Sequence, residues 1–127
     1  ALSLGAKEVK SSITEFADKD LDVIIDFAGG GKTTSDAVNT VKFRGRVVIV
    51  GMAKDFAEIN TMSMIMHELT FVGSQGSTPD DLRDCIQSIA DGKLDPVIKE
   101  ITFDEIGEGI EMLTRGEVKG RLVCVYD

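Results

Sequence analysis

Three consecutive glycines, Gly29 to Gly31, form the segment best suited to contact a ligand through its backbone. They follow the apolar run 21–28, whose β-branched core is typical of a strand buried on both faces of a parallel sheet. Ligands bind at the carboxyl ends of such strands. The glycines lack the offsets of a dinucleotide or Walker loop, which favours a tight turn. Residues 73–78 could likewise be either an anion-binding turn or a structural connection, and a plain strand-to-helix connection is favoured.

Side chains suited to acid–base, nucleophilic or metal chemistry are few and scattered. His67 is the single histidine, and no nearby ligands complete a zinc site around it. No Gly-x-Ser-x-Gly elbow marks a serine nucleophile. Asp22 and Asp26 share one predicted strand, where capping a turn is favoured over an acid–base pair. Cys85 and Cys124 belong to no CxxC motif, so both are predicted to be buried thiols in a reducing compartment.

The composition restricts the class of protein and partner. A length of 127 residues fits one domain. The net charge of −8, from 14 basic and 22 acidic residues, argues against nucleic acid, which clustered basic charge would bind. No run approaches the ~20 apolar residues of a membrane span, so no membrane partner is expected. The chain starts without Met, so we expect it to be a segment of something longer, and its first apolar run is too short for a secretory signal. The reducing compartment predicted for the two cysteines leads us to expect a cytoplasmic origin.

Short apolar runs alternate with amphipathic segments, a pattern that predicts an α/β fold with a mainly parallel sheet. Strands are predicted at 21–28, 46–50, 70–73 and 121–126, and residues 96–101 are also expected to be extended. The Met-rich run 62–66 suits either core packing or an association surface, and both interpretations stay open.

Three helices are predicted between these strands. The first follows Gly31, with hydroxyl residues available as caps and a buried stripe of Ala37, Val38 and Val41. The second begins at Thr78-Pro79 and is expected to bury Leu82, Cys85, Ile86, Ile89 and Ala90. The third, capped by Thr102 or Asp104 and ended by a left-handed Gly116, is expected to bury Ile106, Ile110 and Leu113.

Six short motifs occur along the chain in a characteristic order and spacing. They are Leu-Gly-Ala-Lys-Glu-Val (4–9), Leu-Asp-Val-Ile-Ile-Asp-Phe-Ala-Gly-Gly (21–30), Gly-Arg-Val-Val-Ile-Val-Gly (45–51), Glu-Leu-Thr-Phe-Val-Gly-Ser (68–74), Asp-Gly-Lys-Leu-Asp-Pro (91–96) and Val-Lys-Gly-Arg-Leu-Val (118–123). Together they resemble the medium-chain, zinc-type alcohol dehydrogenase family over nearly the whole chain.

The resemblance implies that residues 1–127 form a single, incomplete Rossmann-like three-layer domain with a mainly parallel sheet. Its full strand order would be 3-2-1-4-5-6. Strands three to six would lie in residues 1–76, at 8–11, 21–28, 46–50 and 70–73. Residues 77–127 would form a helix–helix–strand tail.

The resemblance also implies contacts to NAD or NADP. The adenosine half would lie beside Phe27, Ala28 and Gly29. The nicotinamide would be flanked by Val50, Gly51 and Met52. Its carboxamide would form hydrogen bonds with the backbone of Val50, Thr70 and Val72. The pyrophosphate would be contacted by Arg121, whose forked and permanently charged guanidinium suits that role.

The family's other functional parts would lie upstream of Ala1. They are the first two strands, the GxGxxG turn, the ribose-binding acid, the catalytic zinc ligands and the structural four-cysteine lobe. The expected function is therefore that of a fragment, inactive alone, of an oxidoreductase that transfers hydride between NAD(P) and a small alcohol or carbonyl substrate. Zinc would be held in the missing catalytic domain. The choice between NAD and NADP stays open, because it depends on the second strand.

Two alternatives remain beside this expectation. One is a zinc-free quinone or enoyl reductase of the same superfamily, and the other is a non-catalytic interaction module. In the strand order that the family resemblance implies, residues 21–28 would become an open sheet edge without strand one, and unpaired edges associate. We therefore expect a homo-oligomer formed through this edge, through the Met-rich run, or through both.

Overall fold

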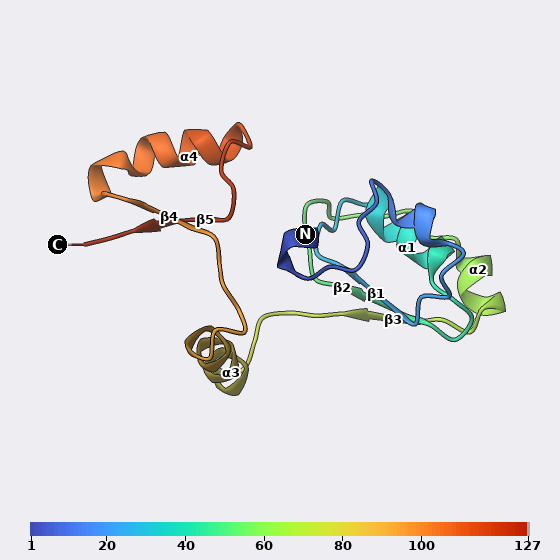
Figure 1. Cartoon of the computed structure of the whole chain (residues 1–127). Coiled ribbons are helices and arrows are strands. Elements are labelled where there is room, and N and C mark those ends of the chain that lie inside the picture. The colour runs from blue at the N-terminus through green and yellow to red at the C-terminus, as the bar shows by residue number, and fades with distance from the viewer. Residues whose placement is uncertain (127) are drawn as a thin grey trace. The chain divides into compact units, whose positions relative to one another are not determined.

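The computed structural model describes residues 1–126 and divides the chain into two compact units, the first at Ala1–Gly76 and the second from Ser77 onward (Figure 1). Both units combine short parallel strands with helices. The predicted α/β class with mainly parallel sheets is therefore confirmed. Within the described residues, no helix has both the length and the apolar character needed to cross a bilayer.

The first unit is built on a parallel sheet with the order β1-β2-β3. Its strands are β1 (Val23–Asp26), β2 (Arg46–Ile49) and β3 (Thr70–Gly73). The register pairs the first residues of all three strands, so the strands begin and end level with one another. The strands predicted in these regions are confirmed. Their carboxyl ends form one edge of the unit.

Helix α1 (Lys32–Thr40) packs against one face of this sheet (Figure 1). The core between them contains Ile24, Val47, Ala37, Val38 and Val41. Val38 and Val47 are both 0% exposed. The stripe predicted for this helix is confirmed, because an apolar spacing of three to four residues places its members on one helical face. Three shorter helices complete the unit: η1 (Leu2–Leu4), η2 (Ile13–Phe16) and α2 (Thr61–Met66).

The opposite face of the sheet is open within the described residues. Val23 and Ile25 of β1 are 51% and 50% exposed, while Ile24 and Asp26 are buried. The expectation that this strand is buried on both faces was therefore wrong. Its continuous apolar run indicates two apolar faces, but α1 covers only one of them.

Residues 8–11 do not form the expected third strand. They are irregular backbone that leads into η2, where Ser12 and Glu15 form a capping box. A strand needs a neighbour to satisfy its backbone, and no described strand lies beside this segment. The outer edge of β1 is likewise unpaired.

The second unit contains α3 (Pro79–Ala90), β4 (Ile98–Ile101), η3 (Phe103–Glu105), α4 (Ile106–Thr114) and β5 (Arg121–Cys124). Strands β4 and β5 pair in parallel. The predicted start of α3 is confirmed: the Thr78 hydroxyl accepts from Asp81 N at 3.2 Å, and the Asp81 carboxylate accepts from Thr78 N at 2.7 Å. Gly116 has the expected left-handed conformation, with φ 70°.

The buried stripes expected in this unit were wrong. On α3, Leu82, Ile86 and Cys85 are exposed, and on α4 both Ile110 and Leu113 are exposed. Helix α4 instead approaches its strands through Gly109, where an added Cβ would lie 3.0 Å from the Leu122 side chain and 3.2 Å from the Ile101 side chain. Cys124 is half-buried rather than buried. Helical periodicity identifies an apolar face, but it does not say what covers that face.

Candidate functional site

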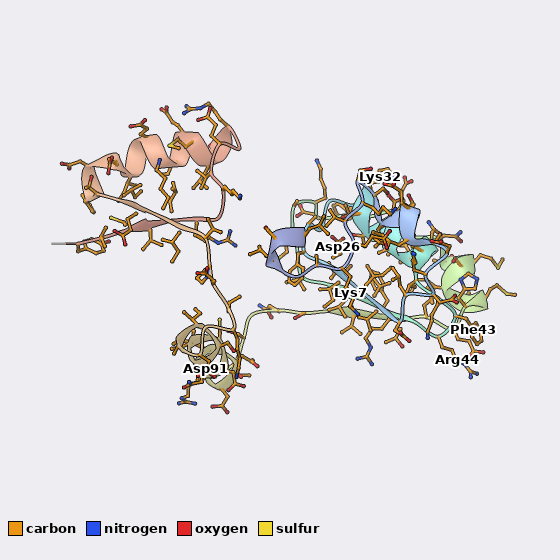
Figure 2. The ribbon with its side chains drawn as sticks, viewed as in Figure 1. Lys7, Asp26, Lys32, Phe43, Arg44 and Asp91 are labelled. Atoms are coloured by element: carbon orange, nitrogen blue, oxygen red, sulfur yellow. The ribbon has the colours of Figure 1, made fainter. Side chains whose placement is uncertain are left out.

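Asp26 is the last residue of β1 and is labelled in Figure 2. Its hydrogen bonds organise the turn that follows it. It is 6% exposed. One carboxylate oxygen accepts from Ala28 N at 3.0 Å and from Gly29 N at 2.9 Å. The Thr33 hydroxyl lies 3.1 and 2.9 Å from the two oxygens, and Thr34 donates to the second at 2.7 Å. A single buried carboxylate thus holds both the glycine turn and the first turn of α1.

The surroundings of Asp26 favour its ionised form. Burial by itself would raise the pKa of this carboxyl group. Hydrogen bonds donated by Gly29, Thr34, Thr33 and Ala28 act in the opposite direction and leave the pKa below its ordinary value. Such a group fixes a turn and does not exchange a proton near neutral pH. The preference for turn capping at this position is therefore confirmed.

The turns that follow β1 and β2 come into direct backbone contact. Val50 N and Gly51 N both donate to the main-chain oxygen of Asp26 at 3.0 Å, and Lys54 N donates to the Gly29 oxygen at 2.9 Å. A Cβ on Gly29 would overlap the carbonyl of Gly51, and a Cβ on Gly51 would overlap the backbone of the first turn. Gly29 also has φ 58°, which favours glycine. We call this joined pair of turns, residues 27–29 and 50–52, the ledge.

A hollow of about 460 Å³ lies beside the ledge and is lined in part by Gly29, Gly51, Met52 and Lys54. Apolar side chains of the ledge are open to solvent: Met52 is 89% exposed and Phe27 is 74% exposed. Ligand sites commonly combine apolar surface with a few backbone groups in this way. The arrangement suits a flat ring system that packs against the turns at the ends of the two strands.

The structure brings together the residues expected to contact the two ends of the cofactor. The turn with Phe27, Ala28 and Gly29 meets the turn that contains Val50 and Gly51, and Met52 follows directly. Val72 lies beside Val48 in the sheet and is 39% exposed, on the open face.

Thr70 does not join this group. It pairs with Arg46 at the start of β2, and its N–H donates to the Gly45 oxygen at 3.0 Å. Val50 lies four residues beyond Arg46, just past the end of β2, which is roughly 13 Å away at the usual rise per residue. Thr70 and Val50 therefore cannot both bond one carboxamide. Ser74, whose N–H donates to the Ile49 oxygen at 2.9 Å, lies level with the ledge instead.

Arg121 lies in the second unit, at the start of β5. Its backbone N–H donates to the Val97 oxygen at 2.9 Å, and its guanidinium donates to the Gly120 oxygen at 3.2 Å. Within residues 1–126 it forms no ion pair. Its charge is therefore available to an anionic group.

Sequence reasoning missed the roles of the two threonines at the start of α1. Hydroxyl residues there were expected to cap the helix, but the N-cap is Gly31, which has no side-chain bond. Thr33 and Thr34 bond Asp26 instead. A usable signal was present, because an acidic residue ends the strand, glycines follow, and two hydroxyl residues come next.

The described residues do not fit a zinc site. Among residues 1–126, no group of three or more His, Cys, Asp or Glu side chains is placed to hold a metal ion. His67 follows α2, and its ring Nδ1 lies 3.4 Å from the Ser63 hydroxyl. We therefore assign no step of chemistry to a metal held by these residues.

Comparison with known proteins identifies the family. The family model described as zinc-binding dehydrogenase matches residues 2–91. The chain belongs to this family. The resemblance seen in the sequence motifs is thereby confirmed.

Individual relatives agree with this assignment. An alcohol dehydrogenase from Geobacillus stearothermophilus is 27% identical over 99 residues, which cover 78% of this chain and 29% of the relative. The crystal structure of AibC matches with a TM-score of 0.85 and 26% identity, covering 95% of this chain and 39% of the other. The acetophenone reductase of Geotrichum candidum, solved with NAD, has a TM-score of 0.79 and 24% identity, with coverages of 85% and 32%. The chain thus spans well under half the length of each of these proteins.

Proposed function

We propose that this chain carries part of the NAD(P) site of a cytoplasmic oxidoreductase that transfers hydride between the cofactor and a small alcohol or carbonyl substrate. The observation that carries the proposal is the ledge, in which two glycine turns at adjacent strand ends are bonded into one surface. Ligands of open parallel sheets bind at this edge. The free cysteines Cys85 and Cys124 are in keeping with a reducing compartment.

Each turn of the ledge is proposed to hold a different half of the cofactor. Phe27, Ala28 and Gly29 contact the adenosine, where the exposed Phe27 ring offers apolar surface. The nicotinamide is proposed to be flanked by Val50, Gly51 and Met52. Bound NAD(P) supplies the hydride, and these residues orient the ring that carries it. Arg121 is proposed to contact the pyrophosphate through its guanidinium.

We also propose that these 127 residues do not turn over substrate by themselves. Asp26 is the buried acid beside the ledge within residues 1–126, and its hydrogen bonds keep it ionised, which removes it from proton transfer. Affinity for the cofactor alone is proposed to be weak, because these residues contain no GxGxxG turn to hold the pyrophosphate at a helix N-terminus.

A titration followed by amide NMR tests the proposal. The full chain, labelled with ¹⁵N, is titrated with NADH and separately with NADPH to millimolar concentration. We expect saturable shifts of the amides of 27–29 and 50–52, with the amide of Thr70, at the other end of the sheet, unmoved. A Gly51→Val variant should lose the shifts, whereas Gly73→Val should keep them, because a Cβ added at Gly73 would meet no atom within 4 Å. Shifts confined to the Thr70 end would contradict the site.

A second proposal, self-association, is favoured by the open face of the first unit. Val23 and Ile25 are half exposed on an unpaired edge strand, and Met62 and Met66 of α2 are exposed too. Unpaired, apolar edges associate readily. We propose a homo-oligomer, and light scattering across a hundred-fold range of concentration should show a rising mass. A constant monomer mass would contradict association.

A further inference from the structure

The amides of residues 28–30, where the glycine turn begins, are already bonded within the protein. Ala28 N and Gly29 N donate to Asp26, and Gly30 N donates to the Thr33 hydroxyl at 3.1 Å. Lys32 N donates to the Gly30 oxygen at 2.9 Å. A turn of this composition, placed before a helix, binds phosphate in other proteins through such free amides. Here the same donors have internal acceptors.

The acceptor that fills the turn is itself an anion. The Asp26 carboxylate is 6% exposed and takes two successive amides on one oxygen, the arrangement that an external phosphate oxygen would adopt. A phosphate at this position would compete with the carboxylate for these amides and would be repelled by its charge. The lysine at the start of α1, Lys32, forms an ion pair with Asp36 at 2.6 Å and not with Asp26.

The main-chain oxygen of Asp26 has a separate role in the same place. It accepts from Val50 N and Gly51 N, which are the first residues after β2. The side chain of Asp26 therefore fixes the first turn of the ledge, while its backbone fixes the second. A displacement of this one residue would move both turns.

We propose that Asp26 is a positioning residue that sets the two turns of the ledge and, by occupying the amides of Ala28 and Gly29, restricts this part of the turn to uncharged parts of the cofactor. The inference rests on the proposed function for its ligand. The phosphates are then held away from residues 28–30. Asp26 touches neither cofactor nor substrate in this role and acts through the turns that it holds.

The test compares Asp26→Ala and Asp26→Asn with a matched control, Asp22→Asn. Asp22 precedes the same strand, is exposed, and forms an ion pair with Lys42 away from the ledge. Each full chain, labelled with ¹⁵N, is titrated with inorganic phosphate and separately with NADH. In the unaltered chain and in the control, phosphate should leave the amides of Ala28 and Gly29 unmoved. In Asp26→Ala it should shift them saturably, because the amides are freed and the charge is removed.

The NADH titration measures the positioning role. We expect the Kd for NADH to rise at least ten-fold in Asp26→Ala and to be unchanged in Asp22→Asn. Asp26→Asn keeps an acceptor oxygen, so it should recover much of the affinity. Equal affinity in Asp26→Ala and the unaltered chain would overturn the positioning role, and phosphate shifts of Ala28 and Gly29 in the unaltered chain would overturn the exclusion of phosphate.

The design separates this inference from the proposed function. If NADH does not shift the amide resonances of the ledge in the unaltered chain, the proposed function is contradicted. The phosphate titration still decides whether the Asp26 carboxylate or phosphate accepts from the amides of Ala28 and Gly29. If Asp26→Ala does not fold, amide exchange in Asp26→Asn decides the positioning role. Loss of the charge should accelerate exchange at Gly29 and Gly51 on the order of ten-fold over Asp22→Asn, and unchanged exchange would overturn the role.

Discussion

Truncation of Val47 to alanine should reveal how much of the first unit's stability comes from the single covered face of its sheet. Val47 is the central residue of the core, 0% exposed, and it packs with Ile24, Val38 and Phe71. Val23 lies on the neighbouring strand, faces the open side and is 51% exposed. The two valines therefore allow one chemical change to be compared on opposite faces of one sheet.

The expected losses differ because only one site leaves a cavity. Removing two methyl groups costs about 1.6 kcal/mol in transfer free energy when they are fully buried. The unfilled space raises the loss at Val47 to about 2–3 kcal/mol. At Val23, where about half of the side chain is already in water, the loss should be about 0.5–1 kcal/mol. The change in strand propensity is common to both variants, so the difference between them reports burial.

Urea unfolding followed through the amide resonances of Ile24 and Val38 measures the free energy of unfolding of the first unit alone. We expect the midpoint to fall clearly for Val47→Ala and slightly for Val23→Ala, with the slope unchanged. Equal losses in the two variants would refute the reasoning. That result would mean that the face bearing Val23 is covered in solution.

Three further outcomes are expected. Gly51→Ala should lower the unfolding free energy by about 2 kcal/mol, because the added Cβ overlaps the carbonyl of Phe27, whereas Gly73→Ala, in open space, should change it by less than about 0.5 kcal/mol. Thermal unfolding compares the two variants, and equal melting temperatures would contradict the close contact at Gly51. Thr78→Ala should cost the helix that follows about 1 kcal/mol, which carbon chemical shifts over 79–90 detect, and Thr78→Ser should restore it. Because the folded pKa of Asp26 lies below its ordinary value, the stability that its ionised form contributes is present at neutral pH and is lost as the pH falls below about 4. Unfolding midpoints measured between pH 7 and pH 2 should therefore fall less in Asp26→Asn than in the unaltered chain. An equal fall in both would count against the hydrogen bonds as the cause of the lowered pKa.

Local elements were predictable because their signals lie within a few residues of one another. The start of α3 depends on Thr78, Pro79 and Asp81, which are neighbours in the chain, and the structure bonds them as expected. β3 spans the same residues, 70–73, that were predicted to form a strand. The stripe of α1 also agreed, since its spacing and its covering sheet belong to the same unit. The matching stripe of α3 failed, because spacing alone says nothing about a covering partner.

The candidate site was predictable to the extent that it consists of strand ends. Residues 27–29 and 50–52 follow strands that were located correctly, and parallel strands bring their carboxyl ends to one edge. The misplaced member, Thr70, depended on the register between β2 and β3. A register is set by backbone pairing across the sheet, and no feature of residues 68–74 alone encodes it.

By itself the sequence determined the α/β class, the family, the strand ends and the positions where glycine is needed, because propensity, capping and apolar spacing act within a few residues. Only the tertiary structure decided that Asp26 bonds the turn beside it with its side chain and the turn after β2 with its main chain. It also decided that one face of the first sheet is covered and the other open. These outcomes depend on hydrogen bonds and packing between segments far apart in the chain, which form only when the strands are aligned.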